Sequence, residues 1–369
     1  KSHAALGAAV ALVALALLGC GGSGGGATAV RTAAQPEPEP PEPAGVAAMP
    51  LERQVGQLLV IAYAGTTPPQ YALDALRGGR VAGVILFGGN APDAATVRAA
   101  AARVQRAAGG DAIVSLDQER GDIRTLAFAP PDVGQARQPT PEAAAEAATA
   151  SALALREVGV NVVLGPVADV AAGTTGSVMA GRAYPGDADA VAASVRAAVR
   201  AYERAGVLPV PKHFPGLGGA TVNTDDAAAV VDRTRTQLAA DLEPFRRSGA
   251  PLVMLGHAVY PALDPRRIAS QSPAIATRLL RDELGFEGVA MTDSLEAQAS
   301  LDTTDGDVGA AAVRSLQAGA DLLLTTGPGS FPLVRDALLA RARRSPAFRA
   351  RVTESAARVV ALRRNMSQR

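Results

Sequence analysis

The sequence has a single cysteine, no tryptophan and only three histidines. One cysteine cannot form an intrachain disulfide, so the folded part must be held together by its core. His3, His213 and His257 form no Cys/His cluster with the spacing of metal ligands, so we predict no metal site. Basic and acidic side chains nearly cancel, at 36 Lys and Arg against 35 Asp and Glu, and neither sign forms a long block. This balance argues against a nucleic-acid binder that neutralises phosphates.

A phosphate-binding loop is also missing. The segment Gly216-Leu217-Gly218-Gly219 follows an expected strand, but it opens no helix with a Lys-Ser/Thr ending. We therefore expect no nucleotide or other cofactor, and a partner that is a neutral or mixed-charge molecule.

An apolar run, Ala4 to Leu18, follows a charged start. It is shorter than the roughly 20 residues that a membrane-spanning helix needs, and its small-residue end is typical of an export signal. The segment Leu17-Leu18-Gly19-Cys20 resembles a bacterial lipobox, in which the cysteine is acylated after cleavage. We expect residues 1–20 to be a lipoprotein signal, with Cys20 anchoring the protein at the outer face of the cytoplasmic membrane. A plain signal peptide is the alternative.

Residues 21–48 are rich in glycine and then in proline. Gly21–Gly26 is a flexible composition, and Pro36–Pro43 favours extended polyproline II. We predict a tether that carries no packed structure before about residue 48, followed by a folded part over residues 49–369.

From Met49 onward, short apolar runs alternate with longer alanine-rich amphipathic stretches. The short runs are apolar throughout, which indicates strands buried on both faces of a parallel sheet. Eight strand–helix pairs favour a closed (β/α)8 TIM barrel, as a single α/β domain, over an open sheet. The expected strands are 57–63, 81–87, 112–116, 160–164, 207–210, 252–255, 288–291 and 321–325, and the expected helices include 93–108, 141–158, 188–205, 236–248, 273–284, 308–318 and 333–344.

Polar side chains recur just after the expected strands. Asp117 follows the third strand, Lys212 and His213 follow the fifth, His257 follows the sixth, and Asp293 follows the seventh. In a barrel these points converge on the C-terminal rim, where the reactions of this fold occur. A capping or core role is the alternative for any one of them, above all for His257. The set as a whole predicts a functional site at the rim.

The segment Lys212-His213-Phe214-Pro215-Gly216-Leu217-Gly218 resembles the Lys-His-Phe-Pro-Gly-His-Gly signature of family 3 glycoside hydrolases, with Leu217 in place of the second His. Other segments agree with the family in order and spacing, so the resemblance covers roughly residues 50–360. The single-domain β-N-acetylglucosaminidase branch is the better match, because we expect no second α/β domain of the kind that the larger β-glucosidases carry. The agreeing segments are 82–87, 116–121, 165–170 with Asp169, 256–261 and 283–295.

The resemblance implies a retaining exo-glycosidase. In such an enzyme Asp293 would attack the anomeric carbon and form a covalent glycosyl-enzyme. Asp117, Lys212 and His213 would bind sugar hydroxyls, and charged groups suit this task because hydrogen bonds to them are stronger than neutral ones. The expected substrate is terminal β-linked N-acetylglucosamine in cell-wall-derived or related glycans, and we expect a monomer.

Two arginines resemble the substrate-contacting arginines of the family. They are Arg182 and Arg124, although the distance from Asp117 to Arg124 is one residue shorter than usual. His257, in the sixth-strand motif, is expected to contribute to substrate binding as well.

The sequence departs from the branch in the loop after the fifth strand. The branch has Asp-Ser-His there, whose His is the general acid/base; counting from Lys212, this sequence has Asn223, Thr224 and Asp225. We expect Asp225 to transfer the proton, with Asp226 as a less well-aligned candidate, because a neighbouring like charge raises the pKa of a carboxyl. The alternative is that both side chains lie in a solvated loop.

Three other functions stay open on the same residues. The first is a sugar-binding lipoprotein that keeps the pocket and has lost turnover, the second is a hydrolase of the β-glucosidase type, and the third is an unrelated barrel enzyme. The sugar, its linkage, and hydrolysis as against phosphorolysis are likewise open.

Overall fold

Eight parallel strands form the sheet of the computed structural model, which describes residues 45–121 and 123–367. Each of the eight overlaps one of the predicted strands, so the predicted barrel is confirmed. In spatial order they are β7 (Leu208–Pro209), β6 (Val162–Val163), β3 (Ile113–Leu116), β2 (Gly83–Leu86), β1 (Leu59–Ala62), β12 (Leu322–Thr325), β11 (Val289–Ser294) and β8 (Leu252–Leu255).

The sheet closes between β7 and β8 through the residues that follow β7. The backbone N–H of Phe214 donates to the carbonyl of Met254 at 2.7 Å, and that of Gly256 donates to the carbonyl of Phe214 at 2.9 Å. These bonds join the two edge strands of the sheet order, so the eight strands make a barrel rather than an open sheet.

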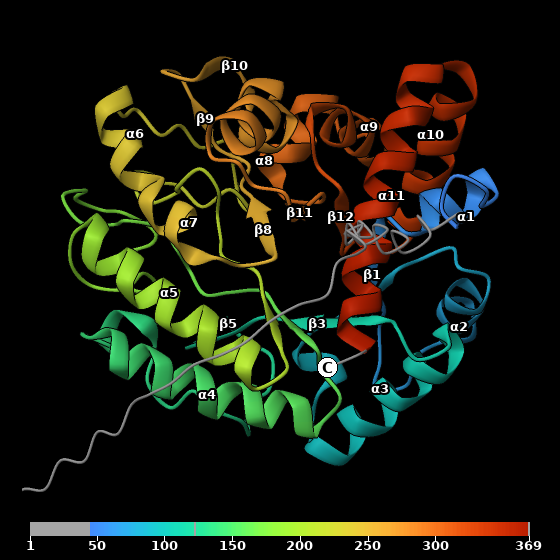
Figure 1. Cartoon of the computed structure of the whole chain (residues 1–369), viewed down its shortest axis with the longest axis horizontal. Coiled ribbons are helices and arrows are strands. Elements are labelled where there is room, and N and C mark those ends of the chain that lie inside the picture. The colour runs from blue at the N-terminus through green and yellow to red at the C-terminus, as the bar shows by residue number, and fades with distance from the viewer. Residues whose placement is uncertain (1–44, 122, 368–369) are drawn as a thin grey trace, which may run out of the picture. The chain divides into compact units, whose positions relative to one another are not determined.

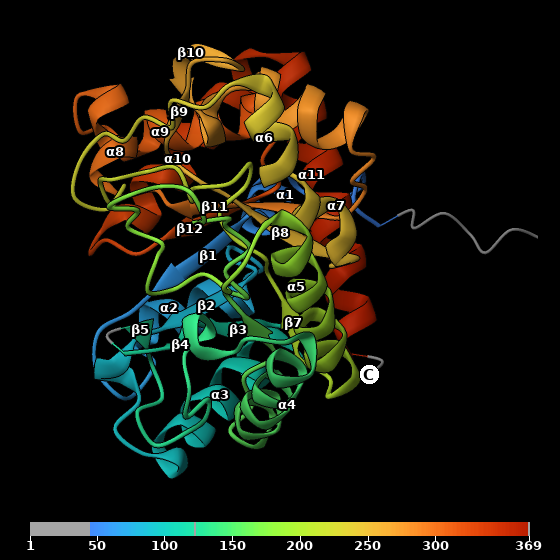
Figure 2. The same cartoon turned by 90° about the vertical axis from the view of Figure 1, so that its left-hand side faces the viewer.

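Helices surround the strands (Figures 1 and 2). The helices that follow the strands in chain order are α2 (Gln70–Arg77), α3 (Ala94–Ala108), α4 (Pro141–Glu157), α5 (Ala188–Arg204), α6 (Arg235–Asp241) with α7 (Glu243–Ser248), the π-helix η4 (Ala274–Glu283), α9 (Val308–Ala318) and α10 (Ser330–Arg344). Further elements are α1 (Leu51–Gly56), α8 (Gln298–Leu301), α11 (Pro346–Ser367), the hairpins β4 (Gln118–Arg120) with β5 (Ile123–Arg124) and β9 (Val259–Tyr260) with β10 (Asp264–Ile268), and the 3-10 turns η1 (Gly88–Asn90), η2 (Gln135–Arg137), η3 (Ala269–Gln271) and η5 (Asp302–Thr304).

Two details differ from the prediction. The expected helix 236–248 is divided into α6 and α7 at Leu242, because Pro244 lacks the N–H that would continue the first helix. Packing also begins slightly earlier than expected, since Val46 is only 4% exposed and belongs to the core. None of the helices in residues 45–121 and 123–367 is long and apolar enough to cross a bilayer.

Strand side chains alternate between two cores. One cluster takes residues from all eight strands, for example Val60, Ile85 and Val289, and fills the barrel interior. Their neighbours along the strands, such as Ile61, pack outward against the helices. From α11, Val359 joins the interior cluster and closes the N-terminal end of the barrel.

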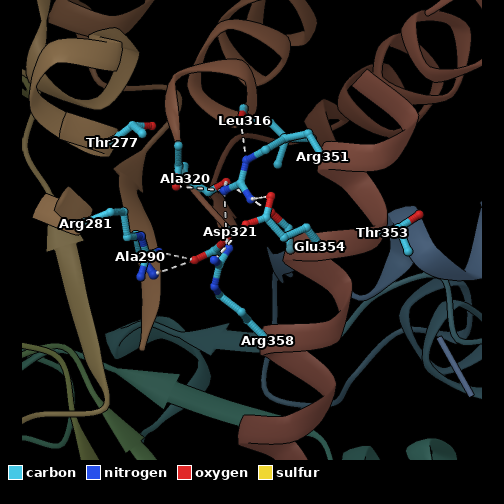
Figure 3. A network of polar contacts seen from close by, with 12 residues as sticks. Thr277, Arg281, Ala290, Leu316, Ala320, Asp321, Arg351, Thr353, Glu354 and Arg358 are labelled. Atoms are coloured by element: carbon cyan, nitrogen blue, oxygen red, sulfur yellow. Dashed lines mark hydrogen bonds and ion pairs between the residues drawn. The ribbon is translucent and has the colours of Figure 1, made fainter. Parts of the chain in front are cut away.

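A buried ionic network stabilises this N-terminal end (Figure 3). Asp321 directly precedes β12 and is fully buried. Its carboxylate accepts hydrogen bonds from Arg281 at 2.5 Å, Arg351 at 2.8 Å, Ser355 at 3.0 Å and Arg358 at 3.2 Å. The network therefore joins α11 and η4 to the start of the strand.

Candidate active site

Three charged side chains reach the C-terminal mouth of the barrel because of the strand period of two. Val289 and Met291 face the barrel interior, so Asp293, two residues further on, continues that inward row at the rim. The same rule carries Val210 on to Lys212, and Ile113 on β3 to Asp117 four residues later. The predicted convergence of these residues therefore follows from the barrel geometry.

Lys212 lies at the centre of a charged cluster. It is 3% exposed, and its ammonium lies 2.5 Å from Asp117 and 2.7 Å from Glu119. Burial alone would lower the pKa of Lys212, but the carboxylates of Asp117 and Glu119 raise it above its ordinary value. Lys212 is therefore a permanently charged donor beneath the mouth of the barrel.

Glu119 connects this lysine to Arg182. The guanidinium of Arg182 donates two bonds to Glu119, at 2.8 and 2.9 Å, in a bidentate pair. Burial would raise the pKa of Glu119, but Lys212 and Arg182 lower it to about 2. Glu119 is thus ionised at any ordinary pH and holds the two cationic side chains in place.

His213 is oriented by Asp169, which is fully buried. The Nδ1 atom of His213 lies 2.8 Å from Asp169, whose other oxygen accepts the backbone N–H groups of His213 and Leu217 at 3.1 and 2.6 Å. This arrangement fixes the imidazole ring so that Nε2 lies 3.9 Å from Asp293.

Asp293 has the properties of an ionised nucleophile. Its side chain is 18% exposed, and one carboxylate oxygen accepts the N–H of Ser294 at 2.8 Å. Burial would raise the pKa of Asp293, but His213, His257 and the Ser294 N–H lower it below its ordinary value of 3.8. A carboxylate that is charged, partly open and next to an imidazole is available to react with a bound electrophile.

His257 lies below this carboxylate and is fully buried. Its Nδ1 lies 2.8 Å from the hydroxyl of Ser270, and its Nε2 lies 2.8 Å from the carbonyl of Ser294. Both ring nitrogens are therefore engaged within the protein. This geometry supports a role in holding the turn after Asp293 rather than the direct substrate contact that the sequence suggested.

The loop after β7 brings Asp225 to the rim. Two backbone hydrogen bonds join this loop to α8. The N–H of Gln298 donates to the carbonyl of Asp225, and the N–H of Ala299 donates to the carbonyl of Thr224, both at 3.1 Å. The Asp225 side chain is exposed, but partial loss of hydration raises its pKa, and the charge of Asp293 raises it further. Asp225 is therefore near enough to Asp293 for the two carboxyls to influence each other. Asp226 is exposed, and its backbone N–H donates to the carbonyl of Asn223 at 3.1 Å.

Comparison with known protein sequences decides the family. The model of the glycosyl hydrolase family 3 N-terminal domain matches residues 50–362. A secreted glycosyl hydrolase of Arthroderma benhamiae is 33% identical over 300 residues, which are 77% of this chain and 84% of that protein. The chain belongs to glycosyl hydrolase family 3.

Solved structures agree with this assignment, among them one named as a family 3 glycoside hydrolase. A β-N-acetylglucosaminidase from a Paenibacillus species aligns with a TM-score of 0.79 and 32% identity over 86% of this chain. A β-N-acetylhexosaminidase from Beutenbergia cavernae aligns with a TM-score of 0.78 and 32% identity over 85% of this chain. This chain spans 63% of the Paenibacillus chain, which is less than two thirds of its length, and 98% of the Beutenbergia chain.

The side chain of Arg124 does not join the charged cluster around Lys212. Its guanidinium donates to the backbone carbonyl of Ala129, at 2.5 and 3.1 Å, within its own loop. Among the described residues, the Arg124 side chain forms no hydrogen bond or ion pair with Lys212 or Asp293. Cys20, the predicted lipidation site, lies outside the residues that the structure describes.

Sequence reasoning missed two side chains of the site. Glu119 lies in the segment 116–121 that resembles family 3, two residues after Asp117. Residues two apart on an extended strand point to the same face, and this spacing could have indicated that Glu119 joins Asp117 in the site. Ser270, the partner of His257, lies 13 residues further on in a 3-10 turn, and no local pattern indicates the contact.

Proposed function

We propose that the protein is a retaining exo-glycosidase that removes terminal β-linked N-acetylglucosamine from cell-wall-derived or related glycans. The main support is Asp293, a partly exposed carboxylate with a lowered pKa at the mouth of a family 3 barrel. The substrate class rests on the names of the Paenibacillus and Beutenbergia structures.

The first step of the proposed reaction forms a covalent glycosyl-enzyme. An oxygen of Asp293 bonds to the anomeric carbon as the bond from that carbon to the leaving oxygen breaks. Asp225, in the protonated form that its raised pKa favours, gives its proton to the leaving oxygen. The leaving alcohol departs neutral, and Asp225 is left as a carboxylate.

The second step reverses these roles. A water molecule attacks the anomeric carbon, Asp225 takes one of its protons, and the ester to Asp293 breaks. Two inversions at the anomeric carbon leave the sugar with its original configuration. Both carboxyls return to their starting protonation states, so the cycle needs no cofactor.

The buried cluster would bind the sugar hydroxyls. Lys212 and Arg182 present donors, and Asp117, which is 23% exposed, presents an acceptor. Glu119 and Asp169 hold these groups and His213 in fixed positions, which reduces the entropy lost when the sugar binds.

The full-length protein should be assayed with aryl β-N-acetylglucosaminide and aryl β-glucoside. We expect release of the aryl group from the first substrate and much less from the second, with the β-anomer as the first product by NMR. An initial α-anomer would contradict the retaining mechanism. A preference for the glucoside would favour the β-glucosidase alternative, and a requirement for inorganic phosphate would indicate phosphorolysis.

The second candidate is a sugar-binding protein without turnover. Its support is the loop in which Asn223, Thr224 and Asp225 stand where the branch has Asp-Ser-His. This candidate predicts that N-acetylglucosamine binds to a protein that hydrolyses no β-glycoside. Calorimetry beside the activity assay separates the two.

We also propose that Cys20 anchors the protein to the membrane, on the evidence of the lipobox-like segment. The variant Cys20→Ala should move the protein from the membrane fraction to the medium, or leave its signal uncleaved. Equal partition of wild type and variant would contradict the anchor.

A further inference from the structure

A groove lies on the outside of the barrel between α2 and α10. It starts at the C-terminal ends of β1 and β12, encloses about 790 Å³ and has a largely apolar lining. The whole sequence has only 12 aromatic side chains, five Tyr and seven Phe, and a third of them line this one groove. They are Tyr63, Tyr71, Phe87 and Phe331.

Two of these aromatic rings are exposed to solvent. Tyr71 is 54% exposed and Phe87 is 40% exposed, in a protein that buries most of its large apolar side chains. Neither ring is therefore needed to fill the core. Clustered exposed aromatics in a concave surface are typical of a ligand-binding groove.

Tyr63 adds a buried polar side chain to the wall of the groove. Its side chain is 5% exposed and lines the groove, and its hydroxyl has no hydrogen-bond partner in the described residues. Leaving a buried hydroxyl unpaired is unfavourable. Burial raises the pKa of Tyr63 to about 12, so the hydroxyl keeps its proton and is a donor at neutral pH.

One wall of the groove contacts the turn that follows Asp293. Thr326 lines the groove, and its hydroxyl lies 2.6 Å from the hydroxyl of Ser294, the residue after Asp293. The groove therefore borders the segment that carries Asp293.

The groove lies on the side of the predicted proton donor. Glu296 accepts hydrogen bonds from the N–H and hydroxyl of Thr326 at 2.8 and 3.1 Å. Just beyond Glu296, the backbone N–H groups of Gln298 and Ala299 hold the loop that carries Asp225. Because a general acid stands next to the leaving oxygen, this connection associates the groove with the leaving-group side.

We propose that this groove binds the leaving group of the substrate, and that it selects glycosides whose leaving group carries an apolar alkyl or aryl segment. The segment packs against the rings of Tyr71 and Phe87. The inference rests on the proposed glycosidase function and specifies its substrate class.

The test compares the methyl, butyl and octyl β-N-acetylglucosaminides, each below its micelle-forming concentration. The three alcohols are similar leaving groups, so the chemistry is held constant while the apolar length grows. We expect kcat/KM of the wild type to rise about tenfold or more from methyl to octyl, because each buried methylene adds affinity. In the double variant Tyr71→Ala/Phe87→Ala this rise should shrink to within about twofold, with the methyl glycoside hydrolysed at the wild-type rate.

Leu153→Ala is the matched control, since Leu153 is 57% exposed on α4 and does not line the groove. It should keep the full dependence on chain length. Equal kcat/KM for all three glycosides in the wild type would overturn the inference while leaving the proposed function intact. If none of the glycosides is hydrolysed, the proposed function fails instead. Calorimetry with the same three glycosides then tests the groove directly. Tighter binding of the octyl glycoside that is lost in the double variant would support the inference, and equal binding of all three would overturn it.

Discussion

The two ends of the barrel carry similar residues in different arrangements. At the N-terminal end, Asp321 is fully buried and pairs with Arg281, Arg351 and Arg358 (Figure 3). At the C-terminal end, Asp293 is 18% exposed, and Nε2 of His213 stands 3.9 Å from its carboxylate. One carboxylate has its hydrogen-bonding capacity filled by the protein, and the other keeps capacity for a ligand.

This difference separates stability from function. A buried carboxylate with all its partners in place holds elements together and has nothing left to offer a substrate. A carboxylate that is charged but incompletely bonded is held in that state by the fold around it. Carboxylates at the bottom of a barrel are therefore expected to affect stability, and those at the top to affect turnover.

The largest effect should come from Asp293→Ala. Turnover should fall on the order of 10⁴-fold or more, because the residue acts mainly in the transition state. The free energy of unfolding should change little, since Asp293 accepts only one backbone hydrogen bond in the described residues. Steady-state kinetics and urea denaturation measure the two quantities. Activity retained within about tenfold would remove Asp293 from its proposed role.

The opposite result is expected for Asp321→Ala. It leaves Arg281, Arg351 and Arg358 without their shared acceptor, and breaking a buried ion pair costs about 3–5 kcal/mol. The folded fraction should keep wild-type kcat. The control is Asp336→Ala, whose side chain is 70% exposed in a surface pair and should change stability by less than about 1 kcal/mol. A similar small loss in both variants would show that the network does not stabilise the barrel end.

The C-terminal end was the more predictable of the two from the sequence. Strands end where their apolar runs end, and the period of two then fixes which side chain enters the mouth, as for Lys212 and Asp293. The contacts of Asp321 with α11 were not predictable in this way. They join residues 30 to 37 positions apart, and their partners depend on how α11 packs.

Other parts of the site depended on contacts that sequence spacing does not encode. His257 appeared to be a rim residue because it follows a strand, but the tertiary structure buries it against Ser270 and the Ser294 carbonyl. Arg124 was expected from motif position, and the hairpin of β4 and β5 directs its guanidinium to Ala129. The groove between α2 and α10 had no linear signal, because its aromatic residues come from four separate segments.

The next prediction concerns the carboxyl pair at the rim. Asp293 must be ionised, and its pKa is lowered, so activity falls only as the pH drops through that low value. Asp225 must be protonated, and its pKa is raised above 3.8, so activity falls as the pH rises through that value. The pH profile of kcat/KM should therefore be a bell on the acid side of neutrality.

The variant Asp225→Asn sharpens this prediction. It should remove the alkaline limb and reduce turnover about 10²-fold or more for alkyl glycosides, with a much smaller loss for activated aryl ones. Asp226→Asn is the neighbouring control and should keep the wild-type profile. If Asp225→Asn behaves like wild type while His213→Gln loses the alkaline limb, the proton donor is the imidazole next to Asp293.

The smallest effect is expected for Glu119→Gln. Glu119, like Asp321, is a carboxylate whose hydrogen-bonding capacity is filled by neighbouring cations, but it lies at the C-terminal end of the barrel. The amide keeps the shape of the carboxylate but removes the charge that holds Lys212 and Arg182. Those two donors bind the sugar before and during reaction, so KM should rise about tenfold while kcat stays within about threefold. Glu142→Gln, on the exposed first turn of α4, should change neither value. An equal fall in kcat and kcat/KM would instead place Glu119 among the groups that act in the transition state, and no change in either would confine it to packing.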